Sequence, residues 1–342
     1  MTAQQDRIEG VLLATAAGDA LGAPYEFEPP RGPELDVTMS GGGVWAPGEW
    51  TDDTAMAIAI AEVAASGEDL RDEAAQDRIV SRWLEWSRDT KDIGIQTSSV
   101  LRTASIGTVI TAQRARDASR ELHASTGRTA GNGSLMRTVP VALAYLNDED
   151  AMVEAARVIS ELTHFDPDAA EACVLWCSAI RHAVLTAELD VRGGLRHLDT
   201  QRQAFWAERL DEAERSRPAD FPNNGWVVSA LQAAWSAIAT TVPAEDPDRG
   251  TLRTDHLRDA LDAAVRGGFD TDTVAAIAGG LLGAAYGASA VPLEWRQLLH
   301  GWPGMTAEEL VRLARKITGE DRSVAHRFRR RTNVRPLWGP KV

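Results

Sequence analysis

Residues 274–293 contain no charged side chain over twenty positions, which is about the length that crosses a bilayer. Gly279, Gly283 and Gly287 recur at every fourth position among alanines. One face of the helix predicted here therefore carries almost no side chains, so a neighbouring backbone can approach it closely. Membrane helix pairs use the same spacing, but the chain has no second stretch of this kind and acids flank it. We predict a buried central helix and no membrane span.

Apolar residues in most of the remaining sequence follow the helical period, and few alternate with a period of two. Alanine is abundant inside these segments, and glycine and proline lie between them. The pattern predicts an all-α fold with helices over residues 7–22, 54–65, 73–87, 98–110, 112–123, 135–145, 149–161, 169–187, 200–216, 226–240, 253–267, 273–289, 292–300 and 306–316.

The sequence has no long linker, so we predict one compact domain over residues 1–318. A short tail, 319–342, follows it; residues 327–341 carry six basic side chains and no acid. A basic strip of this kind either contacts an acidic partner or lies solvated against the acidic body of its own chain. We favour the solvated tail and assign it no function.

Fifty acidic and 36 basic residues give a net charge of −14, which argues against non-specific binding to nucleic acid or to an anionic membrane. The N-terminus carries Asp6 and Glu9 where a signal peptide would need a basic start and an apolar run. Cys173 and Cys177, one helical turn apart in an apolar stretch, are expected to be buried thiols. We expect a cytoplasmic protein that acts as a monomer.

Two clusters of acids each precede an apolar helix. Thr51, Asp52 and Asp53 come directly before the helix predicted over residues 54–65. Residues 270–273 read Asp-Thr-Asp-Thr where the glycine-rich helix begins. Alone, each cluster is explained as a helix cap. Together they supply four carboxylates at the starts of two buried helices, which would repel one another unless cations lay between them. Hard oxygen ligands suit Mg²⁺, Ca²⁺ or Mn²⁺.

Three further positions lie in loops beside predicted helices. Glu26 follows Pro24, and a glutamate there is either solvated or part of a site. Residues 127–137 are rich in glycine and lead into a helix, which suits either a tight turn or the binding of a phosphate by backbone N–H groups. His164, at the end of another helix, is either bonded to backbone or aimed at a ligand.

These motifs, in this order, resemble the ADP-ribosylglycohydrolase family, the relatives of dinitrogenase reductase-activating glycohydrolase. The resemblance covers about residues 7–291 and consists of GDALGAPYEF, WTDDT, DIG, GNGSLMR, TH and DTDT before the glycine-rich helix. It implies an all-α fold around a dinuclear magnesium or manganese centre and the hydrolytic removal of ADP-ribose from a modified acceptor.

The resemblance also implies roles for individual residues. Glu26 matches a glutamate close to the metals and the scissile ribose, and His164 matches a contact to ribose or phosphate. The metal-ligand positions are Thr51, Asp52, Asp53, Asp270, Asp272 and Thr273. The residues expected to be catalytic are Glu26, Asp92 and Asp272. The loop that holds diphosphate and ribose is represented by Asn132, Gly133, Ser134 and Met136.

Two positions bear on specificity. Asp92 matches an aspartate of the arginine-directed branch, and a carboxylate is the natural partner of a guanidinium group. Trp226 matches a position over the substrate, although a tryptophan is also an ordinary core residue. Relatives directed at serine or at poly-ADP-ribose often place an aromatic residue just before Gly-Asn-Gly, whereas residues 128–130 here are Arg-Thr-Ala.

The first hypothesis is therefore a hydrolase with two Mg²⁺ or Mn²⁺ ions that cleaves the N-glycosidic bond of ADP-ribosyl-arginine on a protein and releases ADP-ribose. A second keeps the reaction class but changes the acceptor to a nucleobase, O-acetyl-ADP-ribose or another ADP-ribosyl compound. A third is a non-catalytic binder of ADP-ribose, since a fold can outlast its chemistry.

Overall fold

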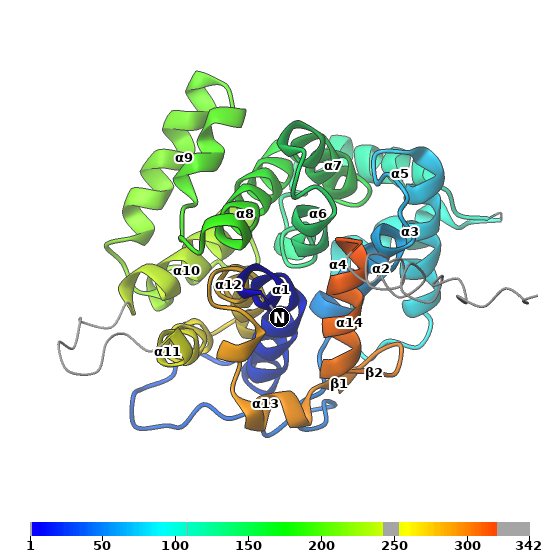
Figure 1. Cartoon of the computed structure of the whole chain (residues 1–342). Coiled ribbons are helices and arrows are strands. Elements are labelled where there is room, and N and C mark those ends of the chain that lie inside the picture. Colours follow the sequence, from blue (N-terminus) through cyan, green and yellow to red (C-terminus); the bar gives the residue numbers. More distant parts are fainter. Residues whose placement is uncertain (1, 108, 242–252, 320–342) are drawn as a thin grey trace, which may run out of the picture.

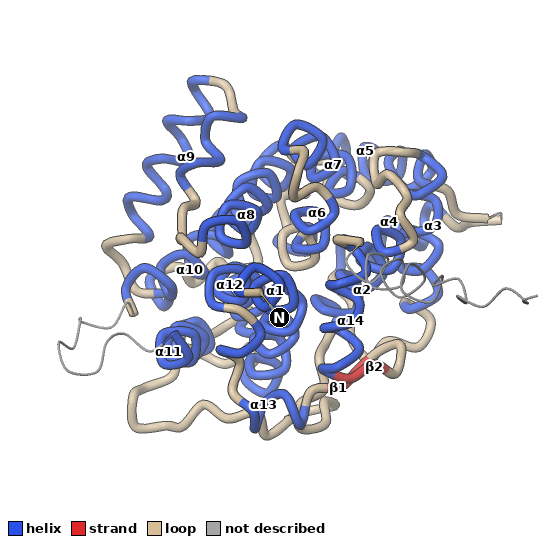
Figure 2. The backbone as a smooth tube through the Cα atoms, viewed as in Figure 1, coloured by secondary structure: helices blue, strands red, loops and turns tan. Residues whose placement is uncertain are grey.

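A computed structural model describes residues 2–107, 109–241 and 253–319, and helices dominate it (Figures 1 and 2). The predicted all-α class is confirmed. The helices are α1 (Ala3–Gly22), α2 (Asp52–Ala65), α3 (Glu73–Trp86), α4 (Ile95–Ala104), α5 (Ala112–Thr126), α6 (Val139–Ala144), α7 (Glu149–Glu161), α8 (Pro167–Thr186), α9 (Thr200–Ala213), α10 (Val227–Thr240), α11 (Arg253–Arg266), α12 (Thr271–Tyr286), α13 (Leu293–Leu298) and α14 (Ala307–Ile317). Residues 320–342, which hold nearly all of the predicted basic tail, lie outside the described residues.

Helices α1 and α12 lie together at the centre of the fold, with the other helices around them (Figure 1). The predicted close approach is confirmed, because their backbones leave no room for a side chain at the contact. A Cβ atom built at Gly18 would lie 2.1 Å from the carbonyl oxygen of Ala275, and one built at Gly279 would lie 2.1 Å from that of Ala14. Within the described ranges, no helix combines the length and the apolarity that a membrane span needs.

The two central helices run antiparallel, and this places the acids of the site. The last residue of α1, Gly22, packs against the backbone of Asp272 at the start of α12, while Gly10 near the other end of α1 packs against Gly283. The C-terminal turn of α1 therefore meets the N-terminus of α12. The first residues of α2 join them through hydrogen bonds to Asp19.

The structure shifts two of the predicted helices. The helix expected over 98–110 is α4, which begins at Ile95 and ends at Ala104. The left-handed φ of Gly107, +69°, prevents it from continuing to residue 110. The helix expected over 135–145 is α6, which starts only at Val139, with Pro140 in its first turn where the missing N–H costs no hydrogen bond. A 3₁₀ turn, Asn132–Ser134, precedes it.

One hairpin was not predicted at all. Strands β1 (His300–Gly301) and β2 (Met305–Thr306) pair antiparallel, with His300 opposite Thr306. Two residues per strand are too few to show an alternating pattern, so the sequence predicted the end of a helix there instead.

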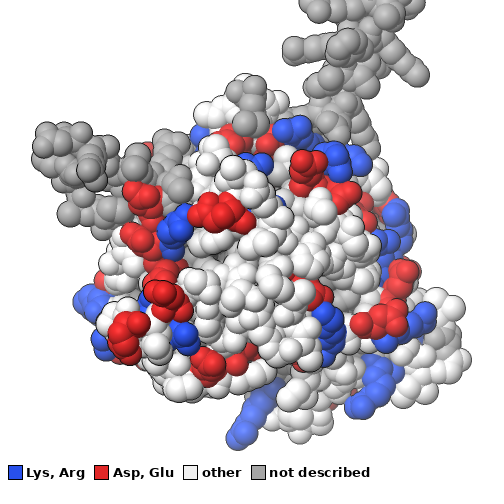
Figure 3. All heavy atoms as spheres, turned by 90° about the horizontal axis from the view of Figure 1, so that it is seen from below, with Lys and Arg blue, Asp and Glu red and all other residues white. Residues whose placement is uncertain are grey.

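The cysteines lie in the core, and charged side chains of both signs lie on the surface. Cys173 and Cys177 are buried free thiols, as predicted. On the face in Figure 3, acidic and basic side chains are interspersed around the edge and other residues fill the middle. Three acids, Asp19, Asp53 and Asp272, are instead buried inside the fold.

Candidate active site

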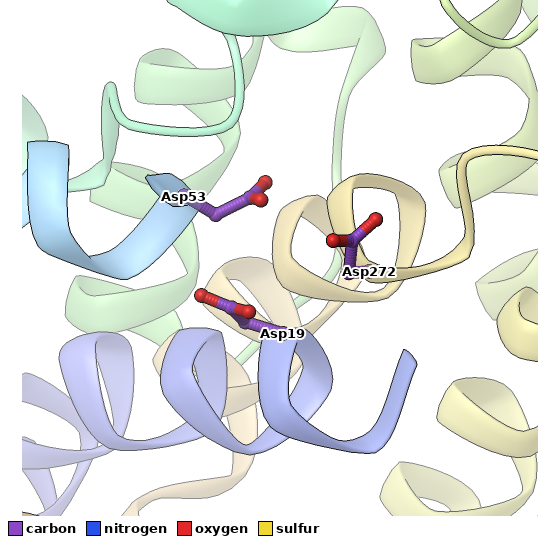
Figure 4. A group of neighbouring side chains, drawn as sticks. All are labelled: Asp19, Asp53 and Asp272. Atoms are coloured by element: carbon purple, nitrogen blue, oxygen red, sulfur yellow. The ribbon is translucent and has the colours of Figure 1, made fainter. Parts of the chain in front are cut away.

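Three carboxylates from three helices converge at the centre of the molecule (Figure 4). Asp19 comes from the last turn of α1, Asp53 from the first turn of α2 and Asp272 from the first turn of α12. One oxygen of each lies within 4.8 Å of the others, and Glu26, Asp270 and Asp272 form a second group on the same criterion. Asp272 thus belongs to both groups, as expected for a residue between two cations.

Within the described part of the chain, no positively charged side chain compensates the charge of these acids. Among the described residues, no arginine, lysine or histidine forms an ion pair with any acid of the two groups. Burial, and then repulsion from Asp19 and Asp52, raises the pKa of Asp53 well above its usual range. Burial and repulsion likewise raise the pKa of Asp52 to about 7 and that of Glu26 to about 8. The site must hold protons or cations to be stable.

The donor set fits a divalent cation. Asp53 Oδ1 is buried and has no hydrogen-bond partner, although the hydroxyl groups of Thr51 and Thr273 reach its other oxygen at 3.1 and 3.4 Å. A carboxylate oxygen in that state needs a positive partner. The ligands offered are carboxylate and hydroxyl oxygens, the kind that Mg²⁺ and Mn²⁺ prefer.

Asp19 is a functional residue that the sequence analysis missed. Its two oxygens accept hydrogen bonds from the backbone of Thr51 (2.9 Å) and Thr54 (3.0 Å), and from the Thr54 hydroxyl (2.6 Å). It therefore holds the loop that presents Thr51, Asp52 and Asp53. A signal was present: an acid in the last turn of a small-residue helix opposes the helix dipole and needs another reason to be there.

A cavity of about 370 Å³ opens above the acids. Of the residues predicted for the site, those that line it are Glu26, Asp52, Asp92, Asn132, Gly133, Met136, His164, Asp270, Asp272 and Thr273. Phe27, Gln96 and Thr97 also line it and were not predicted. Thr51 and Asp53 are buried beneath the lining. The structure therefore brings the two acid clusters and the glycine loop to a single cavity.

Two predicted residues are placed differently. Ser134 is buried, and the side chain of Trp226 is half-buried against the core; neither lines the cavity. Trp226 contributes its backbone instead, because the segment around it pairs with the glycine loop: Asn132 N donates to Gly225 O at 3.1 Å and Val227 N to Ala130 O at 2.9 Å. This pairing, and a 2.7 Å hydrogen bond from Asn132 Nδ2 to Asp270, fixes the loop over the acids.

Glu26 and Asp270 are held by a strained backbone pair. Phe27 and Phe269 both adopt left-handed φ angles, +67° and +64°, which are costly for large side chains. The two segments are bonded to each other, since Phe27 N donates to Phe269 O (2.6 Å) and Phe269 N donates to Glu28 O (2.7 Å). Strain next to two acids of one cluster is typical of a functional site.

A larger cavity, about 610 Å³, lies elsewhere, between the loop around Met39 and helices α11 and α13. Its charged residues include Arg258, which pairs with Glu294 and lies over the ring of Trp295. Those charges are partly compensated within the protein, unlike the buried acids above, so volume alone does not identify the site.

Comparison with known proteins agrees with this geometry. A family model described as ADP-ribosylglycohydrolase matches residues 1–327. An ADP-ribosylarginine hydrolase Tri1 of Pseudomonas putida (strain GB-1) is 31% identical over 299 residues, which cover 85% of this chain and 73% of the relative. The ADP-ribosyl-[dinitrogen reductase] glycohydrolase of Rhodospirillum rubrum is 27% identical, with 85% and 89% covered.

The relatives also include a protein with a different kind of name. The ADP-ribosylhydrolase ARH3 of Bos taurus is 25% identical, with 86% of this chain and 89% of the relative covered. A solved structure titled "ADP-ribosylglycohydrolase-related protein complex" superposes with a TM-score of 0.67 at 30% identity, over 93% of this chain and 99% of the other. The family match, the relatives and the acid-lined cavity lead to one conclusion: the chain belongs to the ADP-ribosylglycohydrolase family.

Proposed function

We propose that this family member is a metal-dependent hydrolase that releases ADP-ribose from ADP-ribosyl-arginine on a protein. The observation that carries the proposal is the cavity in which buried, uncompensated carboxylates, a glycine loop and the exposed acid Asp92 lie together. A relative whose name specifies ADP-ribosylarginine supports the arginine acceptor, and a relative whose name specifies ADP-ribosyl-dinitrogen reductase supports a protein as the substrate. The cytoplasmic location and the monomeric state remain predictions.

The acids Asp52, Asp53, Asp270 and Asp272, with Thr51 and Thr273, would hold two Mg²⁺ or Mn²⁺ ions. Such ions, when bound, bind and orient substrate oxygens and lower the pKa of a water molecule. Hydrogen bonds hold these ligands in place: Asp19 accepts from the backbone at the start of α2, and Thr273 N donates to Asp272 Oδ1 at 2.9 Å.

The remaining residues act on the substrate. In the glycine loop the backbone N–H of Gly133 suits the diphosphate, whereas that of Asn132 already donates to Gly225 O. Asp92 at the mouth suits the positively charged guanidinium. In the reaction, water adds to the ribose carbon, the carbon–nitrogen bond breaks, and the guanidine leaves with a proton. In its ionised form Glu26 can accept the proton of the attacking water and pass it to the leaving nitrogen. Burial and repulsion from Asp270 raise its pKa to about 8, which makes that carboxylate a stronger base.

Replacing Asp92 by alanine tests the arginine contact. Asp92→Ala should lower kcat/KM for ADP-ribosyl-arginine by about 10- to 100-fold, because a charge-assisted bidentate contact is lost. The effect on an ADP-ribosyl compound with an uncharged acceptor should be small. Steady-state kinetics on both substrates measure this, and an unchanged kcat/KM for arginine would favour another acceptor.

Metal binding should also be visible in stability. Mg²⁺ at about 100 times its Kd should raise the free energy of unfolding by about 2.7 kcal/mol. The Tm should therefore be a few degrees higher in Mg²⁺ than in EDTA. The buried acids have raised pKa values, so the metal-free protein loses stability as the pH rises through them. The shift between Mg²⁺ and EDTA should therefore grow with pH and shrink as protons compete below pH 7. Scanning calorimetry at several pH values measures it, and an equal Tm with and without Mg²⁺ at high pH would count against the metal site.

A substrate panel separates the candidate functions. The purified protein with Mg²⁺ would be given ADP-ribosyl-arginine, ADP-ribosyl-serine and O-acetyl-ADP-ribose, and released ADP-ribose would be quantified. We expect the highest kcat/KM with arginine. Faster turnover of another compound would show that the arginine acceptor is wrong and that the hydrolase activity is right. Binding of ADP-ribose by calorimetry with no turnover of any substrate would favour a non-catalytic binder.

A further inference from the structure

Arg137 is a buried cation in an unusual place. It lies in the turn between the glycine loop and α6, and its side chain is fully buried. Its guanidinium lies 4.0 Å from the ring centroid of Trp83, and Nη1 lies 3.7 Å from the sulfur of Met56. No carboxylate of the described residues forms an ion pair with it, and Asp52 acts on it only through its charge; its Nε is buried without a hydrogen-bond partner. An unpaired buried charge is costly, so it calls for a specific role.

Arg137 is linked to His164 through one hydroxyl group. Its Nη2 donates to Thr163 Oγ1 at 2.6 Å, and Thr163 Oγ1 lies 2.7 Å from His164 Nδ1. A guanidinium has donors only, so the threonine oxygen must accept from it. The hydroxyl proton then needs an acceptor, and among the described residues His164 Nδ1 is the one within reach. Nδ1 is therefore unprotonated and the ring proton lies on Nε2.

The protonated nitrogen faces the glycine loop of the cavity. A Cβ atom built at Gly131 or at Gly133 would lie 3.3 or 3.2 Å from His164 Nε2, so the ring lies against loop positions that carry no side chain. His164 lines the cavity, and no described residue accepts a hydrogen bond from Nε2. The donor is left for a ligand.

The charge of Arg137 acts in the same direction as the hydrogen bonds. Burial and then the nearby Arg137 cation lower the pKa of His164 well below its usual range, so the imidazole stays neutral. Burial lowers the pKa of Arg137 itself to about 9, which is still above neutral pH, so the guanidinium stays a cation there. Burial and the neighbouring arginine together thus keep His164 uncharged.

We propose that Arg137 is a positioning residue that, through Thr163, fixes His164 as the neutral Nε2–H tautomer and so presents one N–H donor to a phosphate or hydroxyl oxygen of the ligand. The identity of that ligand as ADP-ribose rests on the proposed function. The tautomer does not, because it follows from contacts within the protein.

Nitrogen NMR of the intact protein tests the tautomer directly. With ¹⁵N-labelled histidine, the His164 signals are assigned by their loss in His164→Gln among the seven histidines. The wild-type protein should show Nε2 protonated and Nδ1 unprotonated at neutral pH. Thr163→Ser keeps the hydroxyl and should leave this pattern unchanged, whereas Thr163→Val removes it and should give a mixture of both tautomers. An Nδ1–H tautomer or an imidazolium in the wild type would overturn the proposal, even if Thr163→Val failed to fold.

Ligand binding supplies the second readout. Calorimetry with ADP-ribose and Mg²⁺ should show a Kd about tenfold higher for Thr163→Val and close to wild type for Thr163→Ser, since one hydrogen bond to a charged group is weakened. An unchanged Kd together with an unchanged tautomer in Thr163→Val would refute the role of Arg137. A protonated Nε2 in a protein that binds no ADP-ribose would support the positioning role and contradict the proposed function, so the two can fail separately.

Discussion

Asp272→Asn should reduce the release of ADP-ribose by a factor on the order of 10³ or more while leaving the protein folded. Asp272 is shared by both groups of three acids, so the loss of its charge affects each of the two proposed cation positions. The amide is nearly the same size as the carboxylate, and its oxygen can still accept from Thr273 N.

Stability should move in the opposite direction to activity. Burial and repulsion from Asp53 and Glu26 raise the pKa of Asp272 well above its usual range, so a neutral amide relieves repulsion in the metal-free protein. In EDTA the variant should therefore unfold at the same temperature as the wild type or above it, and Mg²⁺ should no longer raise its Tm.

The matched control is Asp259→Asn. Asp259 lines the larger cavity away from the site, and burial raises its pKa too. This variant should keep full activity and the full Mg²⁺ shift. Wild-type turnover in Asp272→Asn, measured beside that control, would remove Asp272 from the mechanism.

Gly279→Ala should cost about 3 kcal/mol or more in the free energy of unfolding, which is large for the addition of one methyl group. The new Cβ on α12 would lie 2.1 Å from the carbonyl oxygen of Ala14, a backbone atom of α1 that cannot turn away as a side chain can. Neither helix can move aside without shifting the acids at its end, so we expect lower activity as well.

Urea unfolding followed by circular dichroism measures this cost. Gly225→Ala is the control, since a Cβ there meets no atom within 4 Å and should change stability by less than about 0.5 kcal/mol. If both variants unfolded at the same urea concentration, the close contact of α1 and α12 would be wrong.

The central helix pair illustrates what the sequence alone can predict. The uncharged run with glycine at every fourth residue indicated a backbone contact, and α12 makes it with α1. The pattern did not name α1 as the partner, because spacing within one segment says nothing about distant ones. For the acid clusters, the residue types and the family resemblance predicted one cation site at the starts of α2 and α12, and the structure adds Asp19 of α1 to it.

Other features depend on contacts between segments that are distant in the sequence. Asp19 acts across 32 positions on the backbone of Thr51, a relation that neither composition nor periodicity shows. The side chain of Trp226 was expected over the ligand, but its segment pairs by backbone with the glycine loop, and backbone pairing does not depend on side-chain type. The left-handed φ angles of Phe27 and Phe269 could not be predicted either, because large side chains disfavour that conformation.

The central claim is that buried carboxylates form a metal-dependent site for hydrolysis of ADP-ribosyl-arginine. The most direct test follows release of ADP-ribose from this substrate by the protein first stripped with EDTA and then given Mg²⁺ or Mn²⁺. We predict negligible release after stripping and recovery of activity with either ion. Full release in EDTA would contradict the account.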